Sequence, residues 1–433
     1  MREIVLFLFF GGVFLLFAFF WFGRFLYETG CVKGEKKKIF QQDASFSGEG
    51  VLKRDMIQVF KMALMVRLLV YLAGAIWMLL GSEETSFTLQ QILEQWERWD
   101  APHYMNLARL GYEDFIEDGQ HLFLVFFPLY PWLMRGVHLV VKNWHLCGIL
   151  ISTLAFCVGS CYFYAFVKEE FGKDIAEKSY VLFAAYPFAF FFGGIMTESL
   201  FFCLLSAGLY YISKHRFLVA GVIGLFLSLC RVQGVLLLGV GLVEFFVSYQ
   251  PGKCFRNGML GAFWKDFLTK GIWLFLIPVG NLIYFYLNYR VEGDFFRFQY
   301  YQENHWYHTT TWVPRCLDEI LGNLFGENTT NAMRLAVWLP ELVIFVLTVV
   351  CLVYMVRRHP LKYSAFLLVY TMVNYSVTFL ISGGRYMACA LPLFIVLADI
   401  GKDRPLLYKG MVLSGMLLFG VYFVGYFMGF QIM

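Results

Sequence analysis

The chain has 433 residues, of which 59% are hydrophobic, 20% aromatic and only 15% charged, and its mean hydropathy is +0.62. Soluble domains carry about 25% charged residues, so this composition excludes an ordinary soluble protein and indicates a lipid environment. The formal net charge of +4 is too small to indicate nucleic-acid binding. A membrane span takes roughly 20 apolar residues, so the length fits one bundle of about 11 to 13 spans.

The ten cysteines give no sign of a metal or redox motif. No Cys-x-x-Cys pair occurs, and no spacing of cysteine and histidine suits zinc, so we predict ordinary buried thiols. The first apolar segment, Ile4 to Phe22, is not followed by a small-residue cleavage site. We therefore predict a membrane span there and not a signal that is removed.

Apolar stretches of helical length recur along the chain. We predict spans at about residues 3–23, 56–80, 146–167, 178–193, 197–213, 217–232, 235–250, 272–290, 334–356, 363–381, 387–400 and 407–430. Several are short, and the pair 178–193 and 197–213 is expected to be tilted or broken. The predicted fold class is an all-α, polytopic integral membrane protein.

Lysine and arginine set the predicted orientation. They cluster in connections at residues 33–54, 214–216, 253–270, 357–362 and 402–409. Placing these connections in the cytoplasm follows the positive-inside rule and makes the spans alternate. For the spans to alternate in this way, residues 123–145 must not cross the membrane. Their run Phe126-Phe127-Pro128-Leu129-Tyr130-Pro131-Trp132 has two prolines and many aromatics, which favours a helix lying in the membrane interface.

This topology leaves two large loops facing outward, at about residues 82–145 and 292–334. We expect both to contain interfacial helices. Shorter outward turns are expected at residues 197–198, 231–234 and 383–386. The polar residues that could carry chemistry gather in these loops and turns.

The first outward loop contains the run Arg98-Trp99-Asp100-Ala101-Pro102-His103-Tyr104, followed by Gly111-Tyr112-Glu113. A carboxylate just past the end of a span, packed among aromatics, can be partly desolvated and so tuned as a general base. The alternative is a solvated loop acid beside an aromatic belt. The residues alone leave both interpretations of Asp100 open.

Three further charged residues interrupt apolar stretches. Glu198 is flanked by Thr197 and Ser199, so it is either an intramembrane functional carboxylate or part of a helix cap. Arg231, near Gln233, and Arg385, after two glycines, have the bidentate guanidinium that suits phosphate. Either arginine could instead form a structural ion pair with Glu198 or Asp100.

The second outward loop interleaves aromatics with polar donors from Phe295 to His308, and includes His305. This pattern suits a sugar or a lipid headgroup, and an interfacial aromatic girdle explains it equally well. No Walker loop, dinucleotide fingerprint, HExxH motif or DxD motif occurs. We therefore expect neither a cofactor nor a catalytic metal, although the acidic pairs at 113–114 and 117–118 could hold a weak cation.

An ordered set of motifs resembles the mannosyltransferase family typified by GPI mannosyltransferase 2. The matching residues are Trp99-Asp100-x-x-His103-Tyr104, Gly111-Tyr112, Phe126-Phe127-Pro128-x-x-Pro131, Tyr186-Pro187, Thr197-Glu198-Ser199-Leu200-Phe201, Arg231-x-x-Gly234, and Gly384-Arg385-Tyr386 followed by Pro392. Their order and spacing hold from about residue 56 to the end. Residues 1–55, with an extra span and a basic loop, and the sequence Arg-Val-Gln-Gly at 231–234 depart from the family.

The resemblance implies a GT-C type transmembrane catalytic domain over residues 56–433 that uses a polyprenyl-phosphate mannose donor. Asp100 would then be the catalytic base. We further predict a set of donor- or acceptor-binding residues: His103, Tyr104, Glu113, Glu198, Arg231, Gln233, His305, Arg385 and Tyr386. Within this set, a role for Glu198 would be to orient His103 or an acceptor hydroxyl. The acceptor would be a glycolipid, a wall polymer or a protein, and the short chain favours a bacterial plasma-membrane enzyme with its site outward.

Two other functional classes stay open from sequence. A lipid or sugar transporter, or a flippase, would predict inverted repeats and a polar site at the membrane midplane, and neither is visible. A non-catalytic subunit of a glycosyltransferase complex would retain the same motifs as packing elements. Transfer of sugar by the purified chain alone would separate these classes.

Overall fold

A computed structural model describes residues 2–32, 50–81 and 87–432. The first half contains α1 (Arg2–Glu28), α2 (Lys53–Gly81), α3 (Leu89–Glu94), α4 (Ala101–Leu110), η2 (Leu122–Val125), α5 (Leu129–His138), α6 (Trp144–Phe171), α7 (Lys173–Ala184), η3 (Ala189–Gly193), α8 (Glu198–Ser213) and α9 (Phe217–Cys230). The second half contains η4 (Val232–Val235), α10 (Leu236–Tyr249), α11 (Pro251–Arg256), α12 (Leu260–Thr269), η5 (Gly271–Leu276), α13 (Val279–Glu292), α14 (Arg297–His305), α15 (Val313–Phe325), α16 (Asn331–Met333), η6 (Arg334–Trp338), α17 (Leu339–Arg358), α18 (Leu361–Asn374), α19 (Gly383–Met387), α20 (Leu391–Gly401) and α21 (Pro405–Phe427).

The all-α membrane architecture is confirmed. Within the described residues there is no β-strand, only isolated bridges between Glu117 and Gln120 and between Thr310 and Val377. By length and composition, seven helical stretches can cross a membrane: Glu3–Glu28, Lys53–Gly81, Trp144–Phe171, Val232–Arg256, Gly271–Glu292, Asn331–Arg358 and Pro405–Phe427. Helices α8, α9 and α20 are shorter and apolar, in agreement with the short spans predicted there. The lysine-rich stretch at 33–49 lies outside the described residues.

Helix α6 is the central helix of the bundle, and 67% of the residues in its most apolar stretch are buried. Its neighbours are α2, α7 and α8. Close packing against α8 relies on Gly159, because a Cβ there would lie 2.8 Å from the Cα of Cys203 and 2.8 Å from the ring of Phe202. Without a hydrophobic driving force between helices in lipid, such small residues allow the close contacts that hold membrane helices together.

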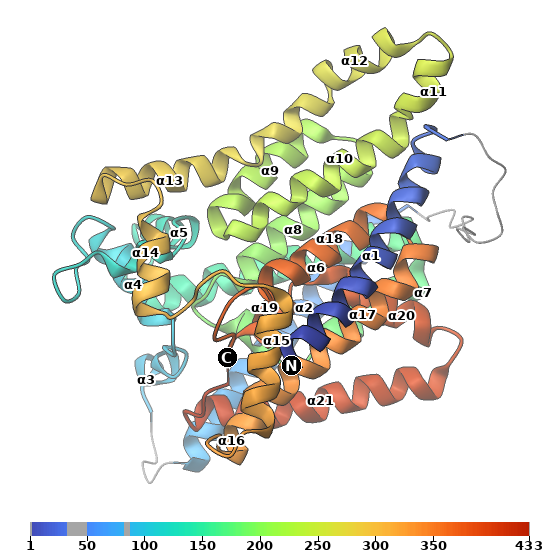
Figure 1. Ribbon diagram of the computed structural model, residues 1–433. Helices are drawn as coiled ribbons and strands as arrows, with labels where there is room; N and C mark the ends of the chain where they lie inside the picture. The colour runs from blue at the N-terminus through green and yellow to red at the C-terminus, as the bar shows by residue number, and fades with distance from the viewer. Residues whose placement is uncertain (1, 33–49, 82–86, 433) are drawn as a thin grey trace.

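The N-terminal helix α1 is attached to the bundle at its two ends. Near its C-terminal end, the buried guanidinium of Arg24 donates to the carbonyl oxygens of Val356 at 2.9 Å and His359 at 2.8 Å. Near its N-terminal end, Phe10 contacts Phe345 with ring centroids 5.2 Å apart. In Figure 1, α1 crosses the face formed by α17 and α18, so the extra span lies on the periphery of the helices that carry the motifs.

The two predicted outward loops meet at one end of the bundle, where α4, α5 and α14 gather (Figure 1). Helix α5 has ten residues, too few to span a bilayer, which agrees with the predicted interfacial segment. An ion pair joins the loops, because His121 Nδ1 lies 2.6 Å from Glu292 Oε1. Tyr301 donates to the same carboxylate oxygen at 2.8 Å.

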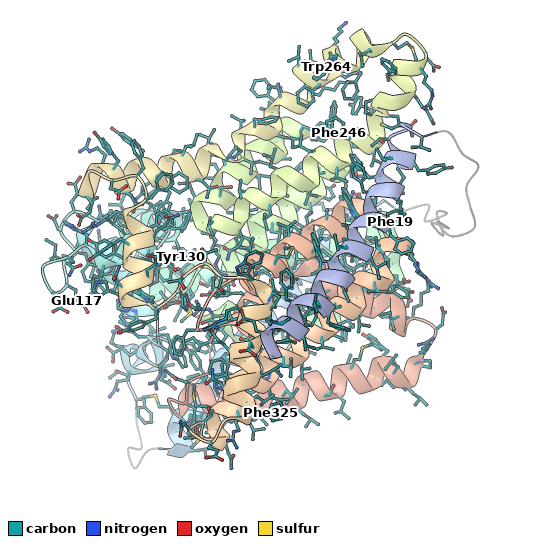
Figure 2. All side chains as sticks on the ribbon, in the orientation of Figure 1. Phe19, Glu117, Tyr130, Phe246, Trp264 and Phe325 are labelled. Atoms are coloured by element: carbon teal, nitrogen blue, oxygen red, sulfur yellow. The ribbon has the colours of Figure 1, made fainter. Side chains whose placement is uncertain are left out.

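Large apolar side chains cover the perimeter. Figure 2 shows Phe19 on the outer side of α1 and Trp264 on α12, and these side chains are 75% and 51% exposed. Such residues are unfavourable in water and suited to contact with acyl chains. The polar groups of the bundle are therefore kept at its ends and in a few buried clusters.

We predict that Gly221→Ala destabilises the bundle, whereas Gly239→Ala does not. A Cβ at Gly221 in α9 would overlap the carbonyl oxygen of Trp273 in η5, while Gly239 in α10 has open space around it. Overpacking of this kind costs about 1–3 kcal/mol. Thermal unfolding of the detergent-purified protein should show a lower midpoint for Gly221→Ala alone, and equal midpoints for both variants would contradict the close approach of α9 and η5.

Candidate active site

Four charged side chains from distant parts of the sequence converge, and each lies at a break between helices. Asp100 immediately precedes α4, and Glu198 is the first residue of α8. Arg231 has extended backbone, with φ −156° and ψ 152°, between α9 and η4. Arg385 lies in the short helix α19. Side chains at helix starts can turn inward where the regular helical packing is interrupted.

The four groups form one connected ion-pair network. Nη2 of Arg385 lies 2.7 Å from Oδ2 of Asp100, and its Nε lies 3.0 Å from Oε1 of Glu198. Nη2 of Arg231 donates to the same Oε1 of Glu198. Glu198 is therefore shared by both arginines. Of the two arginines, only Arg385 pairs with Asp100 in these contacts. The ion pairing that the sequence left open is confirmed.

Burial differs sharply across the network. The side chain of Glu198 is fully buried, that of Arg385 is 6% exposed and that of Arg231 is 11% exposed. Asp100 is 25% exposed and is therefore the member that solvent or a substrate can reach. Two carboxylates and two guanidinium groups balance in charge, which offsets the large cost of removing each ion from water.

Aromatic and hydroxyl groups surround the two arginines. The guanidinium carbons of Arg231 and Arg385 lie 5.6 Å and 5.3 Å from the centre of the Tyr386 ring, within the range of cation–π attraction. Thr197 accepts a hydrogen bond from Nε of Arg231 at 2.7 Å. Among the described residues, Nη1 of Arg231 and Oε2 of Glu198 are buried without a hydrogen-bond partner. Unpaired buried polar atoms of this kind are typical of sites that bind a ligand.

The position of Asp100 is set by Trp99, the residue that precedes it. Trp99 has φ +49°, a left-handed conformation that is costly for a bulky residue. Its ring contacts Tyr426, with centroids 4.8 Å apart, at the C-terminal end of α21. Strain concentrated next to a functional group is common in active sites. Here it turns the chain between α3 and α4 so that Asp100 faces Arg385.

His103 and Tyr104 follow Asp100 within the first turn of α4. His103 stacks on Phe123, with ring centroids 4.3 Å apart. Burial lowers the pKa of the His103 imidazole, although the charges of Asp100 and Glu117 oppose this effect. The ring is therefore predominantly neutral near pH 7. Tyr104 is buried against Phe126 at 4.9 Å, close to the network.

Of the remaining predicted residues, Tyr386 lies beside the network, whereas Gln233, Glu113 and His305 make their contacts elsewhere. Gln233 donates to Asn374 at 3.2 Å. Glu113 is exposed and lies 3.7 Å from Arg290, and His305 contacts Tyr301 with centroids 6.0 Å apart.

Glu198 contacts the arginines, and no hydrogen bond or ion pair between it and His103 occurs among the described residues. From the second loop, His308 also feels the charge of Asp100. Burial lowers the pKa of the His308 imidazole, and the hydrogen bond with the Phe379 carbonyl and the charge of Asp100 only partly oppose this effect.

Sequence reasoning missed two residues that support the site. Thr197 appeared only as a possible cap, yet its side chain caps no backbone group and binds Arg231 instead. Glu341, at the start of α17, is 1% exposed and accepts from the backbone N–H of Gly384 at 3.0 Å. A carboxylate next to a long apolar stretch was the available signal for Glu341.

Metal ligation gains no support from the arrangement of ligands. In the part of the chain that the structure describes, no group of three or more His, Cys, Asp or Glu residues is placed to hold a metal ion. The acidic residues of the network are instead paired with arginines. Independence from metal therefore stays a prediction for experiment.

The fold is similar to that of a solved membrane glycosyltransferase. Over 86% of this chain and 64% of the other, the structure matches ArnT from Cupriavidus metallidurans bound to undecaprenyl phosphate, with a TM-score of 0.50 and 15% sequence identity. ArnT has the GT-C fold, so the predicted fold type is confirmed. No known family model matches the sequence, and no curated protein does. The narrower resemblance to GPI mannosyltransferase 2 therefore stays a prediction.

We predict that Glu198→Ala destabilises the protein more than Asp100→Ala. Removing Glu198 leaves two buried arginines without their shared carboxylate, whereas Asp100 is at the exposed edge of the network. Breaking a buried ion pair by removing one partner costs about 3–5 kcal/mol. Thermal unfolding of the purified variants measures the difference, and a larger loss for Asp100→Ala would show that the network depends on its outer member.

Proposed function

We propose that the chain is a membrane glycosyltransferase that transfers a mannosyl residue from a polyprenyl-phosphate donor to an acceptor outside the cytoplasm. One observation carries the proposal: a carboxylate, Asp100, lies at the accessible edge of a buried pair of arginines. That arrangement supports an assignment of Asp100 as the proton acceptor and of the arginines as the site for an anionic leaving group. The GT-C fold, shared with a protein bound to undecaprenyl phosphate, supports the same donor class.

In this proposal the arginines bind the donor phosphate. A phosphate that approaches Arg385 competes with Asp100 for the guanidinium, because both anions need the same fork of N–H groups. Arg231 has a free N–H at Nη1 for a second contact. Glu198 remains bound to both arginines and keeps them close together. Binding of donor would thus release Asp100 to act on the acceptor.

The reaction balances without a cofactor. The acceptor hydroxyl oxygen attacks the anomeric carbon, the bond between that carbon and the phosphate oxygen breaks, and the hydroxyl proton passes to the Asp100 carboxylate. Polyprenyl phosphate leaves with the electron pair. The arginines offset the charge that grows on the leaving phosphate in the transition state, which is an electrostatic contribution to rate. A single displacement inverts the anomeric carbon, so a β-linked donor gives an α-mannoside.

The remaining predicted residues would serve acceptor and donor binding. His103 and Tyr104 lie on the same helix start as Asp100, and Tyr386 lies beside the arginines. The acceptor would be a glycolipid, a wall polymer or a protein that reaches the outer loops. We place the site on the outer face of a bacterial plasma membrane, where the interfacial helices meet the lipid headgroups.

We expect Asp100→Asn to abolish most transfer, because the amide keeps the size of the side chain and cannot accept the proton. Loss of a general base lowers rates about 10²–10⁴-fold. The measurement is transfer of radiolabelled sugar from polyprenyl-phosphate mannose in membranes that contain wild-type protein, Asp100→Asn or Asp114→Asn. Asp114 is an exposed acid in the same loop and serves as the matched control.

Equal labelling by the wild type and Asp100→Asn would keep the transferase and exclude Asp100 as its base. No transfer by any variant, with folded protein and an acceptor-rich membrane, would favour a different donor sugar or a transporter. Transfer that requires a second protein would favour a non-catalytic subunit.

Chelation of divalent cations should leave the transfer rate unchanged. The donor is already activated by its phosphate, and the arginines supply the positive charge that a metal supplies in other transferases. The same radiolabel assay with excess EDTA, followed by addition of Mg²⁺ or Mn²⁺, measures this directly. A rate that falls with EDTA and returns with either cation would show that the acidic residues of the outer loops bind a catalytic metal.

A further inference from the structure

Glu341 is a buried carboxylate whose contacts the proposed reaction does not explain. It is the third residue of α17 and is 1% exposed. Unlike Asp100 and Glu198, it has no basic side chain within ion-pair distance among the described residues, and the groups that contact it are neutral donors. A carboxylate without a counterion inside a membrane protein is costly and marks a functional position by default.

The neutral donors belong to the segment that leads into Arg385. Oε1 of Glu341 accepts from the N–H of Gly384 at 3.0 Å. The hydroxyl of Tyr375 lies 3.1 Å from Oε2 and 2.9 Å from the carbonyl oxygen of Glu341, and donates to them. Glu341 therefore binds the first turn of α19, where the backbone N–H groups have no partner within the helix.

Gly383 brings the backbone directly against this carboxylate. A Cβ on Gly383 would overlap Oε2 of Glu341, so only glycine permits the approach. On the other side of the turn, a Cβ on Gly384 would lie 2.6 Å from the ring of Phe188. The two glycines that precede Arg385 are thus explained by close packing on both sides of the backbone.

Two tyrosines hold the same turn through its carbonyl groups. The hydroxyl of Tyr186 donates to the carbonyl oxygen of Gly384 at 2.8 Å, and that of Tyr370 donates to the carbonyl oxygen of Tyr386 at 2.8 Å. The residues before and after Arg385 are therefore anchored by buried groups. Glu341 is the acidic member of these anchors, and both its carboxyl oxygens make hydrogen bonds, one with the N–H of Gly384 and one with the hydroxyl of Tyr375.

We propose that Glu341 is a positioning residue that fixes the backbone of Gly383 and Gly384, and thereby sets the guanidinium of Arg385 against Asp100 and Glu198. It does not touch the reacting atoms. Its effect on catalysis rests on the proposed function, in which Arg385 binds the donor phosphate. Its effect on the ion-pair network does not need that function and can be measured without substrate.

The test is a double-mutant cycle with Glu341→Gln and Arg385→Lys, measured first as the apparent midpoint of thermal unfolding. Glutamine retains an oxygen for Gly384 but replaces the second carboxyl oxygen, which Tyr375 contacts, by an amide N–H₂ group. If Glu341 acts on Arg385, Glu341→Gln lowers the midpoint in the wild-type background and clearly less in the Arg385→Lys background. Equal shifts in both backgrounds would overturn the proposal. If Glu341→Gln does not fold, Tyr375→Phe, which removes one donor to the carboxylate, takes its place in the cycle.

The second readout is the same cycle on kcat/KM for the sugar donor. A misplacement of about 1 Å can cost about 100-fold in rate, so we expect a loss of that order in Glu341→Gln. The loss of kcat/KM caused by Glu341→Gln should largely disappear in the Arg385→Lys background. If Glu341 served folding alone, Glu341→Gln would lower kcat/KM by the same factor in both backgrounds. If the wild type transfers no sugar, the proposed function fails, and the unfolding cycle still decides the role of Glu341.

Discussion

The site depends on one shared carboxylate. Glu198 is fully buried and binds both Arg231 and Arg385, which would otherwise repel each other within the bundle. Burying two arginines is tolerated only when their charge is offset and their donors are used. Glu198 therefore allows two guanidinium groups to lie side by side in an apolar bundle. Asp100 completes the charge balance and is the member that remains within reach of a substrate.

The network is assembled at interruptions of helices. A continuous membrane helix uses its backbone groups internally and presents side chains only along its faces. Where a helix begins or breaks, as at Asp100 and Arg231, side chains from different helices can point to a common centre. Glu341 applies the same principle once more, because it binds the exposed N–H of Gly384 at the start of the short helix α19.

The two ends of the bundle have different polar chemistry. At one end, the two loops that the sequence predicts to face outward are joined by the contact between His121 and Glu292. At the other end, Lys362 is buried and pairs with Glu170 at 2.5 Å and Glu244 at 3.1 Å, which cross-links α6, α10 and α18. We interpret the second cluster as structural, since all its charges are mutually paired. In the ion-pair network, by contrast, Nη1 of Arg231 and Oε2 of Glu198 have no hydrogen-bond partner among the described residues.

The sequence by itself determined the fold class, because the apolar length needed to cross a bilayer is a local property that can be counted along the chain. It also singled out Glu198 and Arg231, because a charge in an apolar stretch is costly and conspicuous. Asp100 and Arg385 were noticeable for a different reason, since one is an acid among aromatics just past a span and the other follows two glycines. Only the tertiary structure decided which charges pair, since those contacts join helix starts separated by up to 285 residues. It also brought Glu341 against Gly383 and Gly384, because that close approach exists only once α17 and α19 are packed together in the folded bundle.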